Sequence, residues 1–173
     1  HTHDTSSMQT ATYLKAIEQG VDVVDCALAS VSGLTSQPNF NSMVSVLAQH
    51  ERKPAIDINA INEQSNYWED VRELYYPFES GLKAGTAQVY ENEIPGGQYS
   101  NLKPQAAAVG LVGQDFERVK KNYAVVNELF GDIVKVTPSS KVVGDMAIFM
   151  TSNNLTYQIA ISKIDFRCNS RYP

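Results

Sequence analysis

The sequence predicts an α/β protein that opens with a strand, a helix and a second strand and continues as a mainly helical region. Three observations support this: helical spacing of apolar residues in Met8–Gln19, a β-branched run in Val21–Leu28, and helical stripes later in the chain. The histidine-rich opening would then follow a strand, and ligands of α/β barrels bind beyond the carboxyl ends of strands. The opening residues are therefore the first place to look for a site.

The first helix and the strand after it have clear boundaries. Ala11, Leu14 and Ile17 fall on one helical face, and Gly20 is placed to cap the helix at its carboxyl end. Val21–Leu28 is short, β-branched and followed by the Ser/Gly-rich turn of residues 30–33. These features predict a buried strand.

Three helices are predicted next from apolar stripes in residues 40–48, 67–78 and 116–130. Aromatic residues at this spacing are expected to face a core rather than a cofactor. Residues 30–39 and 91–101 lack periodicity and are rich in turn formers, so both are predicted loops.

The last predicted helix follows Thr137-Pro138 and has its apolar face in Val142–Met150. Proline favours the first helical position, so Thr137 is expected to be the N-cap. A threonine hydroxyl also donates and accepts a hydrogen bond at once, so a proton relay is the functional alternative. Lys141 would project from the first turn, where most lysines are simply solvated.

Composition excludes several classes of protein. The 173 residues include 14 basic and 19 acidic side chains, a net charge of −5, with no basic run. This argues against a surface for nucleic acid or for an anionic membrane. The sequence has no apolar window of about 18 residues that could cross a bilayer. Two cysteines make no disulfide framework, and no signal-like opening is found, so a cytosolic or organellar location is expected.

The sequence begins on its most reactive motif, His1-Thr2-His3-Asp4. On a strand His1 and His3 point to the same side, about 7 Å apart, and can share one divalent ion if further ligands converge. The spacing alone leaves open a surface pair or a tag remnant. Asp4 and the hydroxyls after it also suit a helix cap.

Five segments together carry a resemblance to a known family, namely His1–Ser6, Val23–Asp25, Ser32–Pro38, Tyr90–Leu102 and Gly131–Met146. In this order they resemble the carboxyltransferase domain of biotin-dependent pyruvate carboxylases, over positions 1–156. Asp4 and the run 139–141 favour the carboxylase over the related oxaloacetate decarboxylase alpha and transcarboxylase subunits. Ser7 stands where the family usually has glycine, and residues 157–173 differ from the family's continuation.

The resemblance implies a (β/α)₈ TIM barrel followed by a helical funnel. Residues 1–38 would be the end of the barrel with its last two strands, residues 39–156 the helical extension, and residues 157–173 an unassigned tail. Barrels of this kind need roughly 200 residues or more. The start at His1 is therefore expected to be a cut through the active site, and the isolated chain is expected to be inactive.

Site roles are implied residue by residue. His1 and His3 are similar to two ligands of the active-site divalent ion, manganese or zinc, and the other ligands, an aspartate and a carboxylated lysine, would lie upstream. Thr137 matches the proton shuttle between pyruvate and biotin. Ser140 and Lys141 match residues of the biotin and substrate pocket.

The implied reaction is carboxyl transfer from carboxybiotin to pyruvate, giving oxaloacetate. Biotin would be carried on one absent domain, and ATP and bicarbonate would be used by another. A homotetramer is expected for the full-length enzyme, in the cytoplasm or, in a eukaryote, the mitochondrial matrix, with no nucleic-acid or membrane partner. The alternatives are a decarboxylase or transcarboxylase subunit, or a non-catalytic helical interaction module.

Overall fold

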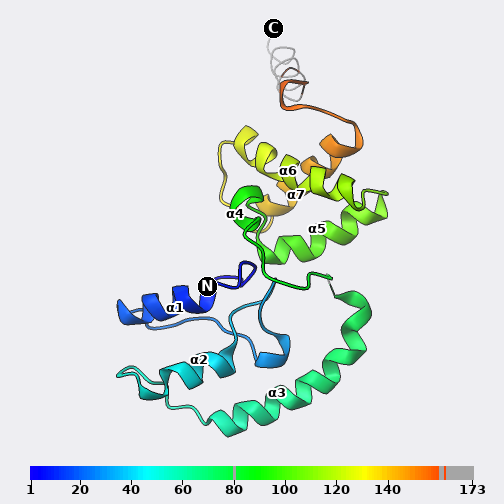
Figure 1. Ribbon diagram of the computed structural model, residues 1–173. Coiled ribbons are helices and arrows are strands. Elements are labelled where there is room, and N and C mark those ends of the chain that lie inside the picture. Colours follow the sequence, from blue (N-terminus) through cyan, green and yellow to red (C-terminus); the bar gives the residue numbers. More distant parts are fainter. Residues whose placement is uncertain (80, 160–161, 163–173) are drawn as a thin grey trace. The chain divides into compact units, whose positions relative to one another are not determined.

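The computed structural model describes residues 1–79, 81–159 and 162 (Figure 1). The chain forms two compact units, His1–Val89 and Tyr90–Pro173. Within the described residues every regular element is a helix, and the one isolated β-bridge joins Ala27 to Asn39 in parallel. None of these helices has the length and apolar composition needed to span a membrane.

Leaving residue 80 aside, the first unit contains three α-helices and three short 3₁₀ helices: α1 Gln9–Glu18, η1 Ala29–Val31, α2 Phe40–Val46, η2 Leu47–Gln49, α3 Ile58–Arg72 and η3 Glu73–Phe78 (Figure 1). Tyr13 and Ile17 of α1 pack against Met43 and Leu47 to form its buried cluster. The apolar spacing that predicted α1 therefore identified the face that is buried.

The carboxyl end of α1 is capped as the sequence predicts. Gly20 has φ +99°, its N–H donates to the Ile17 carbonyl at 3.1 Å, and the Val21 N–H donates to the Ala16 carbonyl at 3.1 Å. These two bonds make a Schellman motif, which satisfies carbonyls that the helix leaves free. Glycine suits this position because it adopts a positive φ without a Cβ clash.

The predicted strand Val21–Leu28 is not formed within the described residues. Residues 21–26 have no regular secondary structure, and the parallel bridge at Ala27 is their only strand-like neighbour in the described region. Val21 and Val23 are 42% and 78% exposed rather than buried. A strand forms only with a hydrogen-bonding neighbour, and residues 1–79, 81–159 and 162 supply no adjacent strand.

The aromatic stripe on α3 and η3 is also not core-facing. Six large side chains are 45–83% exposed here: Tyr67, Trp68, Leu74, Tyr75, Tyr76 and Phe78. The helix was predicted, and it begins earlier than the stripe, at Ile58. Helical spacing identifies an apolar face but cannot say whether the same chain contains the element that covers it.

Helix α4, Val89–Asn92, begins at the boundary of the two units, and the helices with both ends in the described part of the second unit are α5 Gly96–Ala108, α6 Gln114–Leu129 and α7 Ser139–Ser152 (Figure 1). Its core combines α5, α6 and α7 with Ile94 and consists of fully or nearly fully buried side chains: Ile94, Leu102, Ala106, Phe116, Val119, Tyr123, Val126, Val143, Ala147 and Met150. The stripe predicted for residues 116–130 is thus confirmed as core-facing.

Helix α5 corrects the loop predicted for residues 91–101. It begins at Gly96, directly after Pro95, and buries Leu102 and Ala106. The first helical N–H groups need no intrahelical partner, so Pro95-Gly96-Gly97 does not prevent a helix from starting there. The predicted tail, residues 157–173, lies mostly outside the described residues; residues 157–159 are helical, not a strand.

Candidate functional site

His1 and His3 lie together in the first unit. Their ring centroids are 5.2 Å apart and the ring planes meet at 82°. His1 Nδ1 lies 2.9 Å from Asp25 Oδ2, and His3 Nδ1 lies 2.5 Å from the Thr35 carbonyl oxygen. Both partners are hydrogen-bond acceptors, so each imidazole presents N–H at Nδ1.

This arrangement leaves both Nε2 atoms as lone-pair donors when the rings are neutral. Metal-binding histidines usually donate their other ring N–H to a carboxylate or a backbone carbonyl, which fixes the tautomer and the ring orientation. Asp25 and Thr35 are such partners. Sequence reasoning missed both roles, although Val23–Asp25 and Ser32–Pro38 were among the segments singled out.

The backbone around the histidines is held by several contacts. The Asp4 N–H donates to the Ser36 carbonyl at 2.7 Å, and the Thr2 N–H donates to the Tyr13 hydroxyl at 3.0 Å. Burial raises the pKa of Tyr13, which keeps the phenol neutral. The Asp4 carboxylate accepts from the Gln9 N–H at 3.0 Å, which agrees with its predicted capping role at α1.

Ser7 adopts φ +60°, a conformation that favours glycine. Its side chain fills the space over Gly85, where an added Cβ would lie 2.1 Å from Ser7 Oγ and 2.8 Å from Ser7 Cβ. The adjacent Thr86 N–H donates to the Thr5 carbonyl at 2.8 Å. Serine at this position is thus accommodated by a glycine in the facing loop.

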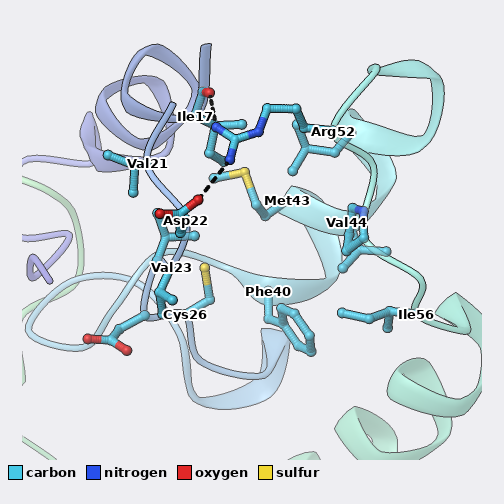
Figure 2. Close-up of a pocket in the computed structure, with 14 residues that line it drawn as sticks. Ile17, Val21, Asp22, Val23, Cys26, Phe40, Met43, Val44, Arg52 and Ile56 are labelled. Carbon is cyan, nitrogen blue, oxygen red and sulfur yellow. Dashed lines mark hydrogen bonds and ion pairs between the residues drawn. The ribbon is translucent and has the colours of Figure 1, made fainter. Parts of the chain in front are cut away.

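A pocket of about 490 Å³ lies beside the extended residues 21–26. Figure 2 shows Arg52 at its edge, donating to the Ile17 carbonyl at 2.7 Å and to Asp22 Oδ1 at 3.4 Å. Its apolar wall includes Cys26, Phe40, Met43, Val44 and Ile56. Burial raises the pKa of the Cys26 thiol, and the nearby Asp25 charge raises it further. This wall therefore carries no thiolate at neutral pH.

Thr137 is not the N-cap of α7. The helix begins at Ser139, its cap residue is Pro138, and no side chain caps it. The Ser140 N–H donates to the Val136 carbonyl and the Lys141 N–H to the Pro138 carbonyl, both at 3.1 Å. Since backbone carbonyls accept these first N–H groups, the exposed Thr137 hydroxyl is not used as a cap.

Ser140 and Lys141 follow in the first turn of α7. Ser140 is buried, and its carbonyl accepts from the Tyr123 hydroxyl at 3.4 Å. Burial, with a smaller contribution from Glu93, raises the pKa of Tyr123 to about 12. Lys141 Nζ contacts both carboxylate oxygens of Asp145, at 2.9 and 2.7 Å, so it is paired rather than only solvated.

A polar cluster that the sequence did not predict holds the segment before Thr137. Glu93 Oε2 accepts from Lys135 Nζ at 2.5 Å and from Asn127 Nδ2 at 3.0 Å. Asn127 Nδ2 also lies 3.2 Å from Asp132 Oδ1. The Lys135–Glu93 pair spans 42 positions in the sequence, so no local pattern could have revealed it.

The predicted residues therefore form two groups. His1 and His3 belong to the first unit, and Thr137, Ser140 and Lys141 lie close in sequence in the second. No group of three or more histidine, cysteine or acidic side chains within the described ranges could hold a metal ion together. A metal at His1 and His3 would need further ligands.

Comparison with known proteins gives a consistent result. Residues 89–169 match the family described as the conserved carboxylase domain. Pyruvate carboxylase of Bacillus subtilis (strain 168) is 52% identical over 156 residues, which is 90% of this chain and 14% of that protein. The mitochondrial pyruvate carboxylase of Homo sapiens is 46% identical over 158 residues, covering 90% of this chain and 13% of that protein.

Solved structures agree. The carboxyl transferase domain of Rhizobium etli pyruvate carboxylase with pyruvate matches 94% of this chain and 27% of that chain, with a TM-score of 0.90 and 52% identity. The structure of the same domain with pyruvate and biocytin matches 91% of this chain and 26% of that chain, with a TM-score of 0.88 and 53% identity. This chain thus spans about a quarter of the solved domain and 13–14% of these two curated relatives.

Proposed function

Because this chain belongs to the pyruvate carboxylase family, within its carboxyltransferase domain, we propose that the full-length protein transfers a carboxyl group from carboxybiotin to pyruvate. The product is oxaloacetate. The observation that supports this most is the 53% identity to a carboxyl transferase domain solved with pyruvate and biocytin. We assign the same two ligands to this protein, with biotin on a carrier domain, and ATP and bicarbonate consumed on another domain.

We propose Thr137 as the proton relay. Carboxybiotin loses CO₂ and leaves a biotin enolate that must gain a proton, and the pyruvate methyl group must lose one. A neutral hydroxyl between them gives its proton to biotin and takes one from the methyl carbon, and the pyruvate enolate then attacks CO₂. The exposed Thr137 hydroxyl, which caps no helix, suits this role.

Ser140 and Lys141 are proposed to line the biotin and substrate pocket next to the relay. The Tyr123 hydroxyl, protonated at any working pH, fixes the Ser140 backbone through its carbonyl. Lys141 pairs with Asp145 across the helix surface, and its rotatable ammonium donors can turn toward an anionic or carbonyl group of a ligand.

A divalent ion, manganese or zinc, is proposed at His1 and His3, which would bind it through Nε2 because Nδ1 of each ring faces an acceptor. When bound, the ion supplies Lewis-acid stabilisation of negative charge that develops on the substrate oxygen. The remaining ligands, an aspartate and a carboxylated lysine, are assigned to parts of the protein outside this sequence. Asp25 and Thr35 orient the rings.

Elemental analysis of the full-length protein tests the metal site. We expect close to one bound ion per chain in the parent and at least a tenfold lower content in His3→Ala. Asp25→Asn should weaken manganese affinity about 10–100-fold, because it loses the carboxylate that orients His1. His50→Ala is the matched control and should bind metal like the parent. Full metal content in His3→Ala would remove this site from the proposal.

The proposed architecture keeps residues 1–38 as the end of a TIM barrel and residues 39–156 as its helical extension, with residues 157–173 unassigned. Residues 21–28 would become a barrel strand once neighbouring strands pair with them.

A homotetramer is proposed for the full-length enzyme. Its location is proposed as the cytoplasm, or the mitochondrial matrix in a eukaryote, as in the human relative named mitochondrial.

An assay of the full-length protein tests the reaction. We expect oxaloacetate to form from pyruvate only when both ATP and bicarbonate are supplied, and avidin to stop the reaction by sequestering biotin. Decarboxylation of oxaloacetate without any ATP-dependent synthesis would instead identify a decarboxylase or transcarboxylase subunit. Absence of both activities in a biotinylated, folded protein would favour a non-catalytic module.

A further inference from the structure

The segment that carries Thr137 has little backbone support of its own. Residues 133–136 have no regular secondary structure, and Val134 and Val136 are 80% and 62% exposed. An irregular exposed segment keeps one geometry only when side chains hold it. A relay hydroxyl needs such a hold, because a displacement of about 1 Å can cost roughly 10²-fold in rate.

The amino-terminal end of this segment is tied to α6. Gly131 adopts φ +81°, and the Asp132 N–H donates to the Asn127 carbonyl at 2.9 Å. The Asn127 side chain also donates to the Asp132 carboxylate, at 3.2 Å. Asn127 is 2% exposed, so this tie is made from the protein interior.

The carboxyl-terminal end is tied to α7. Ser139 Oγ lies 2.5 Å from each of the Val134 and Val136 carbonyl oxygens and accepts from the Val136 N–H at 3.1 Å. These contacts lie on either side of Lys135 in the sequence.

Between these two ties, the Lys135 side chain reaches Glu93, which lies in the loop between α4 and α5. Its ammonium group lies 2.5 Å from Glu93 Oε2, and the Lys135 side chain is only 19% exposed. The Asn127 amide donates to the same carboxylate oxygen, so Glu93 is held from the interior side as well. The Lys135 pair therefore connects the Thr137 segment to a carboxylate that is itself fixed.

We propose that Lys135, through its ion pair with Glu93, is a positioning residue that holds Thr137 for proton transfer. This inference rests on the proposed role of Thr137. An ion pair at the protein surface, such as this one with its half-exposed Glu93, contributes little to stability. Loss of a pair that served only stability would therefore leave kcat almost unchanged in a folded enzyme, whereas loss of a positioning pair lowers kcat.

The test uses variants of the full-length enzyme. Lys135→Met and Glu93→Gln should each lower kcat for oxaloacetate synthesis about 10–30-fold and change KM for pyruvate less than about twofold, within the range that misplacement can cost. The double variant should be no slower than the slower single variant, because both substitutions break the same pair. Lys135→Arg, which keeps the charge, should recover kcat to within about threefold of the parent.

The controls distinguish failure of the positioning role of Lys135 from failure of the proposed relay role of Thr137. Lys15→Met, which breaks the exposed Lys15–Glu18 pair on α1, should leave kcat unchanged. If Thr137→Ala abolishes turnover while Lys135→Met and Glu93→Gln both stay within twofold of the parent, the positioning role is overturned and the relay stands. If Thr137→Ala retains turnover, the relay itself fails. If the loss of kcat in the double variant equals the product of the two single losses, the two residues do not act through one pair, and the proposal is overturned. If Lys135→Met fails to fold, Glu93→Gln still tests the pair.

Discussion

Thr137→Ala in the full-length enzyme is expected to lower kcat for oxaloacetate formation by about 10²–10⁴-fold, the range that a positioned acid–base group supplies. The substitution removes the group that both donates and accepts the proton. Thr137→Ser keeps a hydroxyl and should retain turnover within roughly tenfold of the parent. Steady-state assays with saturating pyruvate, ATP and bicarbonate measure the difference.

The fold should not change in Thr137→Ala, because the side chain is exposed and caps no helix. The melting temperature is therefore expected to match that of the parent. Bicarbonate-dependent ATP hydrolysis, proposed for a separate domain, should persist. Near-full oxaloacetate synthesis by the alanine variant would show that another group moves the proton, and a large drop in melting temperature would reduce the effect to misfolding.

Those parts of the fold that depend on local chemistry could be predicted from the sequence. Apolar spacing together with Gly20 located α1, and the stripe ending before Gly131 located α6. In both cases the glycine follows the C-cap residue of the helix and adopts a positive φ. Helical spacing and a glycine cap act within a few residues, so one sequence is enough to recognise them.

Other predictions failed because the local structure depends on parts of the protein that are distant in sequence. Val21–Leu28 has the composition of a buried strand, but a strand needs a neighbouring strand, which the described residues do not supply. The aromatic stripe of α3 and η3 is similarly exposed. Helix α5 was missed for a different reason: turn-forming residues at its start concealed a helix whose burial depends on Leu102 and Ala106.

The candidate site divides in the same way. The spacing of His1 and His3 suggested a shared ligand, and the structure places the two rings in contact. Their acceptors, Asp25 and Thr35, lie 24 and 32 positions away and needed the structure to be found. For Thr137, the Thr-Pro sequence suggested a cap, but the backbone carbonyls of Val136 and Pro138 take the first helical N–H groups instead.

Asn127→Asp is expected to destabilise the chain at pH 7 by about 3–5 kcal/mol, the cost of leaving a buried charge uncompensated. Asn127 is 2% exposed, its Nδ2 donates to two carboxylates, and its Oδ1 has no partner within the described part of the chain. Aspartate would lose both donated bonds and place a third carboxylate beside Glu93 and Asp132. The Lys135 ammonium group is already paired with Glu93. Urea unfolding followed by circular dichroism measures the free energy of unfolding.

The pH dependence of the free energy of unfolding distinguishes an electrostatic cost of Asn127→Asp from a packing cost. Burial and the two neighbouring carboxylates should raise the pKa of the new aspartate above its ordinary value of about 3.9. A folded-state pKa above the unfolded one means that the folded state binds the proton more tightly, so the deficit relative to the parent should shrink as the pH falls toward about 4. Asn122→Asp is the matched control on α6, because it replaces a single bond to Thr151 Oγ1 and should cost only about 1 kcal/mol. A deficit of equal size in both variants, or one that does not change with pH, would mean that the Asn127 site does not act through its two carboxylates.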